Sequence, residues 1–170
     1  MNITDVWKLK FNAGRPTTVP QDDIVQLLWY DGLVLGHIAA DFETLLIAFC
    51  SESEDKRTRL FLGYLLTSDC LRPEDASFLR SQLSETRATA DSEEYENATS
   101  RLLNLWEQTT NLILIEADPA FGKVLRSTIV PKSDVEKYWL RMEDFYLLSI
   151  EARRLRHERL VQLLGKHELG

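Results

Sequence analysis

The stretch that decides the predicted fold, residues 24–66, reads IVQLLWY-DG-LVLGHIAA-DFE-TLLIAFC-SESEDKR-TRLFLGYLL. Its four apolar runs, at 24–30, 33–40, 44–50 and 58–66, each have the length of a β-strand. The dipeptide Asp31-Gly32 between the first two runs is a strong signal for a tight hairpin turn. The stretch therefore predicts a meander of four strands.

Further strands are expected on both sides of this meander. Residues 6–11 alternate apolar and charged side chains, which is the period of a half-buried strand. In the second half of the chain, residues 111–118 predict a strand, and residues 123–130 predict its partner across a Pro- and Gly-containing turn. Residues 98–108 fit a helix or a strand equally well, so both alternatives stay open.

Helices are expected to cover the sheet, because the third and fourth apolar runs are nearly continuous and require protection on both faces. Pro73 stands at the first position of one amphipathic helix. Ser133 and Glu136 have the spacing of a capping box and predict the start of a short helix. A last long helix is predicted from about residue 142 or later to residue 164, with Gly165 as its terminator.

The fold class predicted from these patterns is α+β. It consists of a mostly antiparallel β-meander sheet covered by helices, with a long C-terminal helix. Residues 1–148 are expected to form the α+β domain and residues 149–170 a C-terminal helical extension.

Composition restricts the class of partner. The 170 residues are 44% hydrophobic and 28% charged, as in an ordinary globular protein, with a formal net charge of -7. An acidic chain is a poor match for a nucleic-acid backbone, which is bound mainly through Lys and Arg. Residues 84–100 are polar and mostly acidic, which predicts a solvated loop. Residues 131–170 carry eight Lys or Arg against seven Asp or Glu, so only the tail is locally basic.

The compartment expected from the sequence is the cytoplasm, with no membrane partner. Cys50 and Cys70 are the only cysteines and do not make a disulfide framework. The first residues lack the pattern of a signal peptide, and no apolar run approaches the roughly 18 residues of a membrane span.

Signatures of catalysis or of a cofactor are not found in the sequence. Glycine-rich phosphate loops, nucleophile elbows and zinc-protease helices do not occur, and we expect no cofactor and no metal. His37, with Asp31 and Asp41 near it in sequence, is the candidate for a composite His/carboxylate site, although a structural histidine is the favoured interpretation. His157 and His167 are expected to be solvated.

Acidic residues and tryptophans offer two further candidate sites, one for a cation and one for an interface. Asp22 with Asp23, and the acidic group within 91–96, could hold a hard cation, but neither has a calcium-loop pattern, so surface acidity is favoured. The four tryptophans are expected mostly in the core, and one that is exposed would be a good interface anchor. They are Trp7, Trp29, Trp106 and Trp139.

The C-terminal helix holds the candidate interaction residues. Leu148, Ala152 and Leu155 form one apolar stripe, and a second, displaced stripe follows it. The candidates are Arg153, Arg154, Arg156, Arg159, Leu160, Leu163 and Leu164. One interpretation packs the leucines on the domain and leaves the arginines in water; the other exposes the helix for self-association or for a groove in a partner.

The order of the features over residues 22–148 resembles a group of small bacterial and phage-associated α+β domains of unknown function. The resemblance rests on a strand that ends in Trp29-Tyr30-Asp31-Gly32, three further strands, a helix, and a late strand pair followed by a short helix. It implies a fold and a prokaryotic or phage context, and no chemistry.

The function expected is therefore a noncatalytic protein-interaction or regulatory module. Its setting would be a bacterial or phage system, such as defence, counter-defence or a toxin–antitoxin-like pair, and its partner another protein or a second copy. The alternatives are an enzyme with a composite site at His37, and nucleic-acid or nucleotide binding through the C-terminal arginines.

Overall fold

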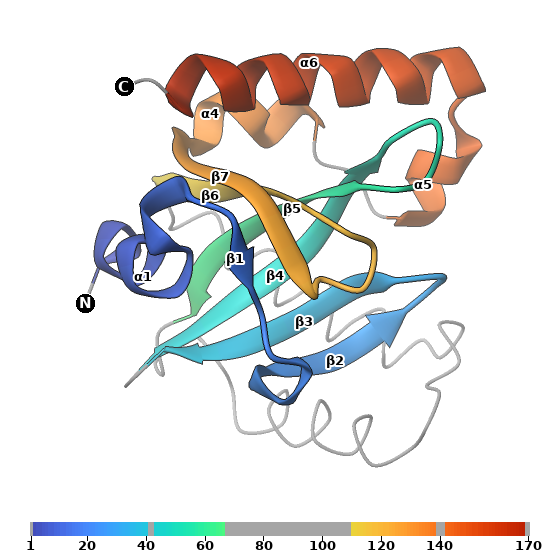
Figure 1. Cartoon of the computed structure of the whole chain (residues 1–170). Helices are drawn as coiled ribbons and strands as arrows, with labels where there is room; N and C mark the ends of the chain where they lie inside the picture. Colours follow the sequence, from blue (N-terminus) through green and yellow to red (C-terminus); the bar gives the residue numbers. More distant parts are fainter. Residues whose placement is uncertain (1, 41–42, 67–109, 139–141, 169–170) are drawn as a thin grey trace.

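The computed structural model describes residues 2–40, 43–66, 110–138 and 142–168 (Figure 1). The strands are β1 (Thr17–Thr18), β2 (Ile24–Trp29), β3 (Leu33–Ala40), β4 (Glu43–Glu52), β5 (Arg59–Leu66), β6 (Asn111–Ala117) and β7 (Lys123–Pro131). The α-helices are α1 (Ile3–Lys10), α4 (Lys132–Val135), α5 (Met142–Leu147) and α6 (Ile150–Glu168). Short 3₁₀ turns are η1 (Asn12–Gly14), η2 (Gln21–Asp23) and η4 (Glu136–Tyr138).

The seven strands form one sheet in the order β1-β7-β6-β5-β4-β3-β2, and every neighbouring pair is antiparallel. The predicted α+β class is confirmed, as are the four strands of residues 24–66 and the pair formed by 111–118 and 123–130. Each of these strands lies next to the strand that precedes it in the described chain, as consecutive strands most often do.

The sheet curls, because β1 and β2 lie at opposite edges although only η2 and two flanking residues separate them in the chain. A flat sheet of this width would set its edges about 29 Å apart, at about 4.8 Å per strand. The chain from Thr18 to Ile24 can span at most about 22 Å. The two edges must therefore bend toward each other.

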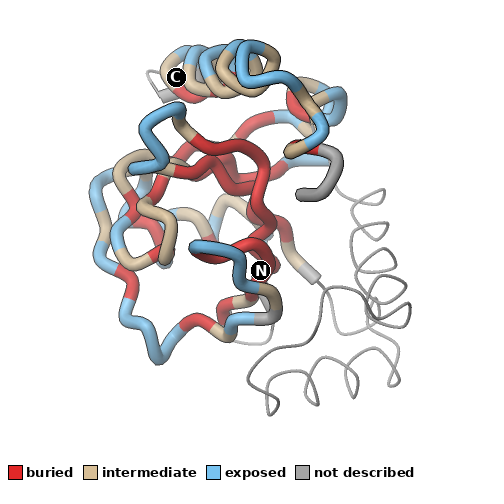
Figure 2. The backbone as a smooth tube through the Cα atoms, turned by 90° about the vertical axis from the view of Figure 1, so that its right-hand side faces the viewer, coloured by how far each residue is buried: buried red, intermediate tan, exposed pale blue. Residues whose placement is uncertain are grey.

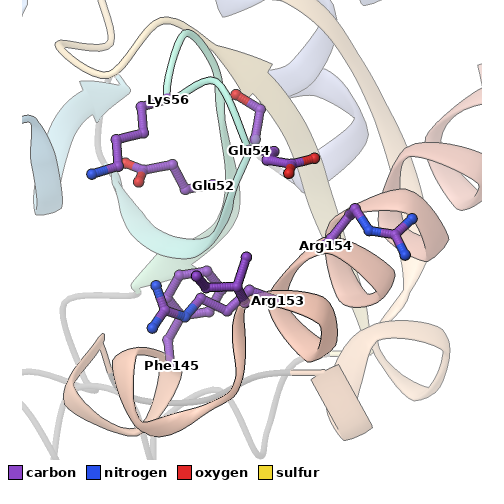
Figure 3. A pocket seen from close by; sticks show the side chains of 8 residues that line it. Glu52, Glu54, Lys56, Phe145, Arg153 and Arg154 are labelled. Carbon is purple, nitrogen blue, oxygen red and sulfur yellow. The ribbon is translucent and has the colours of Figure 1, made fainter.

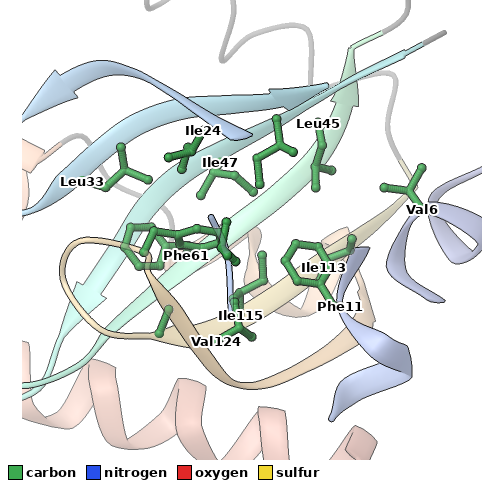
Figure 4. Packing of buried hydrophobic residues seen from close by; sticks show 14 residues of the cluster. Val6, Phe11, Ile24, Leu33, Leu45, Ile47, Phe61, Ile113, Ile115 and Val124 are labelled. Carbon is green, nitrogen blue, oxygen red and sulfur yellow. The ribbon is translucent and has the colours of Figure 1, made fainter. Parts of the chain in front are cut away.

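Both faces of the sheet are covered. The inner cluster lies on the face toward which the sheet curls, and it includes Leu33, Leu45, Ile47, Phe61, Ile113 and Val124 (Figure 4). The outer cluster includes Leu46, Ala48, Leu60, Leu62, Leu112 and Leu114. Successive residues of β4 alternate between the two clusters, as the period of a strand requires. Buried residues accordingly concentrate along the strands beneath α6 (Figure 2).

The strand predicted over residues 6–11 is wrong, because this segment belongs to helix α1. Asn2 and Asp5 form a reciprocal capping box that starts the helix. Val6 is fully buried, and the Trp7 indole donates a hydrogen bond to Ser127 Oγ at 3.0 Å. Leu9, which an alternating pattern would place inside, is 65% exposed. Contacts with β6 and β7 therefore select the helical period.

The C-terminal region differs from the prediction in two details. The helix expected from about residue 142 or later begins at Ile150 as α6, and a separate short helix, α5, precedes it. Ser149 Oγ accepts a hydrogen bond from the Ala152 N–H at 3.1 Å where α6 begins. Gly165 does not end α6 but lies inside it.

The short helix expected near Ser133 forms as α4, but its start is not the predicted one. Pro131 occupies the N-cap position, and no side chain caps the helix. The capping box of Ser133 and Glu136 is therefore absent, because the helix begins two residues too early for it.

Several expectations concern residues outside the part of the chain that the structure describes. They are the helix opened by Pro73, the acidic loop over 84–100 with the acidic group at 91–96, the helix-or-strand alternative at 98–108, Cys70, Trp106 and Trp139.

Candidate functional site

Exposed apolar side chains gather where the β2–β3 turn meets the end of α5. Tyr30 is 57% exposed, Leu147 is 83% exposed and Ile150 is 70% exposed. The Tyr30 ring contacts the Tyr146 ring, with centroids 5.8 Å apart, so the turn and α5 are neighbours. We call Tyr30, Tyr146, Leu147 and Ile150 the apolar corner. Exposed apolar side chains that gather in one place are typical of interaction sites.

A pocket of about 210 Å³ adjoins the apolar corner (Figure 3). The end of β4 and the β4–β5 turn line one side, and α5 and α6 line the other. Its lining residues are Glu52, Ser53, Glu54, Lys56, Phe145, Ile150, Arg153 and Arg154. Phe145 is 1% exposed, so an apolar ring lies behind a rim of charged side chains.

Arg153 holds the link between α5 and α6. Its guanidinium donates to the carbonyls of Leu148 and Tyr146, each at 3.1 Å, and therefore satisfies carbonyl groups at the end of α5. It also lies over the rings of Phe145 and Tyr146, with Cζ 5.8 and 5.2 Å from their centroids. This predicted interaction residue thus shapes the pocket wall.

Arg59 fixes the β2–β3 turn from beneath. Its Nε donates to Glu52 Oε2 at 2.8 Å, and its other nitrogens donate to the carbonyls of Leu33 at 3.0 Å and Tyr30 at 2.8 Å. The guanidinium also stacks over the Phe49 ring, 5.2 Å from its centroid. Because Glu52 lines the pocket, one buried pair supports both the pocket and the exposed turn.

The sequence analysis missed this pair, although a signal was present. Glu52 and Arg59 flank the polar turn between two apolar strands, and their Cα atoms are register partners. Opposite charges that face each other across a hairpin are a known stabilising pair. Their burial could not be read from the pattern, because it depends on the β2–β3 turn.

His37 lies in the middle of β3, between Val25 of β2 and Leu46 of β4. The His37 side chain makes no hydrogen bond or ion pair with any residue that the structure describes, and its Nδ1 is buried without a partner. Burial lowers the pKa of the imidazole. Asp31 lies in the β2–β3 turn and Asp41 outside the described residues, so the composite His/carboxylate site is not assembled in the described part.

His157 was predicted to be solvated, but its side chain is half-buried on the face of α6 that lies against β4. Its Nδ1 lies 2.9 Å from Ser51 Oγ, and Ser51 is fully buried. Burial lowers the pKa of His157, while the nearby carboxylates of Glu116 and others oppose this effect. A serine beside a histidine is the arrangement of an activated nucleophile. Here the serine is closed to any substrate, so the pair joins α6 to β4.

The predicted interaction leucines divide between core and surface. Leu160 and Leu164 are fully buried in the outer cluster, and Leu163 packs against it in part. These side chains are not available to a partner, because the core already covers them. Helix α6, which falls in the part predicted as a C-terminal extension, therefore contributes to the same core as the sheet. Of the first predicted stripe, Leu155 is 43% exposed.

The predicted interaction arginines have different surroundings. Arg154 forms ion pairs with Glu151 at 3.6 Å and with Glu158 at 3.0 Å along the exposed side of α6. Arg156 and Arg159 lie next to Tyr138 of η4 instead. The arginines therefore do not form one continuous basic face.

In the part of the chain that the structure describes, no group of three His, Cys, Asp or Glu side chains is placed to hold a metal ion. Asp22 and Asp23 are exposed in η2. None of the described helices has the length and apolar content needed to span a bilayer.

Comparison with known proteins returned no match to a family model, to a curated protein or to a solved structure.

Proposed function

We propose that the protein is a noncatalytic interaction module that binds a protein partner at the apolar corner and its adjoining pocket. The observation that carries this proposal is the exposure of Leu147 and Ile150, two large aliphatic side chains beside a pocket. Burial of such side chains in a partner contributes roughly 25 cal/mol per Å² of apolar surface.

The pocket has room for one large side chain of the partner. A cavity of about 150 Å³ in another protein accepts a benzene ring, and this pocket measures about 210 Å³. The buried Phe145 ring offers an apolar contact, and aromatic pairs add to the energy of burial. An aromatic or branched aliphatic side chain therefore fits the pocket best.

The charge around the pocket favours a partner with an acidic residue next to the side chain that enters the pocket. Lys56, Arg153 and Arg154 line the rim, whereas Glu52 is already paired with the buried Arg59. Among the described residues that line the pocket, Glu54 is then the one remaining acidic residue. We infer a partner segment in which a large apolar residue adjoins Asp or Glu.

We further propose the setting expected from the sequence, a cytoplasmic module, within the bacterial or phage context that the resemblance implies. In this proposal only the start of the C-terminal helix contacts the partner, through Ile150, Arg153 and Arg154 of α6. The buried leucines of α6 do not contact it.

Site-specific photo-cross-linking in the native host tests the proposal. A photoreactive residue in place of Leu147 should cross-link to a specific protein, which mass spectrometry identifies. Leu9 is the matched control, because it is 65% exposed on α1, at a different part of the surface. Cross-linking that is the same from both positions would contradict the proposal.

Binding to the cross-linked protein is then measured with purified components. Leu147→Asp and Ile150→Asp should each weaken binding by about 30-fold or more, as expected for an anchor residue worth about 2 kcal/mol. Leu9→Asp should leave the Kd unchanged. All three positions are exposed, so the variants should keep the wild-type Tm. Cross-linking from Leu147 only to a second copy of the chain would replace the proposed partner with self-association.

A further inference from the structure

Three cationic side chains converge on one phenol where η4 meets α6. Lys137 lies over the Tyr138 ring, with Nζ 5.0 Å from the ring centroid. Burial opposes ionisation of the Tyr138 hydroxyl, but the nearby positive charges of Arg159 and Lys137 outweigh this effect and lower its pKa. Arg156 is close enough to interact electrostatically with the same hydroxyl. We call Lys137, Tyr138, Arg156 and Arg159 the Tyr138 cluster.

Arg156 lacks the acceptors that a partly buried guanidinium requires. Its Nη1 is enclosed by the protein and has no hydrogen-bond partner, and the side chain makes no hydrogen bond or ion pair with the described residues. A buried donor without an acceptor costs free energy, so an acceptor bound at this position would stabilise the folded protein.

Several other arginines that the structure describes are paired with carboxylates, while Arg153 donates to backbone carbonyls. Arg59 pairs with Glu52, Arg126 pairs with Glu116, and Arg154 pairs with Glu151 and Glu158. None of the described Asp or Glu residues forms an ion pair with Lys137, Arg156 or Arg159. Among the described residues these three cations therefore have no ion-pair partner, in a chain with a net charge of -7.

We propose that the Tyr138 cluster is a binding site for a phosphate group, either inorganic phosphate or the phosphate of a small monoester. Two guanidinium groups, one ammonium and one hydroxyl offer more donors than the two oxygens of a carboxylate can accept. Phosphate presents at least three acceptor oxygens and carries up to two charges near neutral pH. Arginine forks suit its oxygens in a bidentate geometry.

A single phosphate group suits this site better than a nucleic-acid chain. The cluster is compact, and the rest of the protein would repel a long polyanion because of its acidic excess. The site is also independent of the proposed partner surface, because its cluster shares no residue with the apolar corner or the pocket.

Calorimetric titration of the full chain with inorganic phosphate at low ionic strength tests the site. Wild type should bind one phosphate with saturation, and phenyl phosphate should compete for the same site. Arg159→Gln should weaken binding about tenfold, since a hydrogen bond to a charged group is lost. Lys137→Gln should weaken it similarly, and the double variant should bind no phosphate.

Arg154→Gln is the matched control on the same helix, because Arg154 is also partly exposed but is paired with carboxylates. It should keep the wild-type affinity within about twofold. Arg159 is exposed, so its loss should not unfold the chain even if Arg156→Gln does. A second readout is the ultraviolet titration of Tyr138, identified by Tyr138→Phe, whose pKa should rise when phosphate withdraws Arg159 and Lys137 from the hydroxyl.

Four results would overturn the proposal. One is the absence of saturable phosphate binding, and another is equal weakening by Arg154→Gln and Arg159→Gln. The third is equally tight binding of sulfate. The fourth is binding of a short single-stranded oligonucleotide when neither phosphate nor phenyl phosphate binds. The first of these would leave the partner surface unaffected, because Leu147→Asp tests that surface separately.

Discussion

Arg59 and Glu52 form an ion pair across the β4–β5 hairpin, with Nε 2.8 Å from Oε2 and side chains only 1% and 8% exposed. The same guanidinium donates to the carbonyls of Tyr30 and Leu33, which lie on either side of the β2–β3 turn. Two hairpins are therefore held together by one buried cation, and the exposed Tyr30 depends on it for its position.

Replacement of Arg59 should unfold the chain more readily than replacement of any exposed arginine. Arg59→Met leaves Glu52 buried without its partner, so we expect a loss of about 3–5 kcal/mol in the free energy of unfolding. Arg126→Gln, which breaks the more exposed pair with Glu116, should cost about 1 kcal/mol or less. Chemical denaturation measures both, and equal losses would show that the buried pair has no special role.

Substitution by alanine should lower the stability of the protein at Gly32 and raise it at Gly165. Gly32 has φ +144°, and an added Cβ would lie 2.6 Å from the Pro119 carbonyl oxygen and 2.8 Å from Arg59 Nη1. Gly32→Ala should therefore destabilise the protein by more than 1 kcal/mol. Gly165 lies in α6 with no atom near its Cβ position, so Gly165→Ala should stabilise by up to about 1 kcal/mol. The Tm of each variant, measured by thermal unfolding, checks both expectations. A Gly32→Ala protein with a raised Tm would contradict the described conformation of the β2–β3 turn.

Leu160→Ala tests whether α6 belongs to the core. Removal of this fully buried side chain should cost about 2–5 kcal/mol. Leu155→Ala, on the same helix at 43% exposure, should cost much less. Deletion of residues 149–170 should likewise prevent stable folding, because it would expose the outer cluster. A deleted chain that still unfolds cooperatively would restore the view of α6 as a separate extension.

The buried His157 should make the protein less stable in mild acid. Burial lowers its pKa in the folded state, so the unfolded state binds the proton more readily. Its contribution is complete above the unfolded pKa of about 6.5 and is lost as the pH falls below that value. The carboxylates of Glu52, Asp55, Glu116 and Glu158 reduce the shift but do not reverse it.

The measurement compares wild type with His157→Gln, since glutamine can still hydrogen-bond to Ser51. The difference in unfolding free energy between the two proteins should shrink from pH 7.5 to pH 5.5. His37 also has a lowered pKa, and it is present in both proteins, so its effect cancels. A constant difference over this range would exclude His157 as a contributor.

The strands could be predicted because their signals are local. Asp31-Gly32, the polar turn 51–57 and the turn before Lys123 each separate apolar runs of strand length. The N-terminal segment was predicted wrongly because six residues satisfy an alternating and a helical pattern at once. Only the contacts of Val6 and Trp7 with the curled sheet distinguish the two.

The candidate site was predicted only in part. Arg153 and Arg154 were named from the sequence and do line the pocket, whereas Leu160 and Leu164 proved to be core. An apolar stripe on a helix looks the same whether it packs on its own sheet or on a partner, so the sequence does not separate the two uses.

The sequence by itself determined the order and type of the strands from residue 24 onward, because hairpin turns and apolar period act between neighbouring residues. The tertiary structure decided which charges are buried, which leucines are exposed and which cations lie together. Glu52 with Arg59, and Arg156 with Tyr138, acquire their properties from elements distant in the chain, whose approach depends on how the sheet curls and where α6 packs.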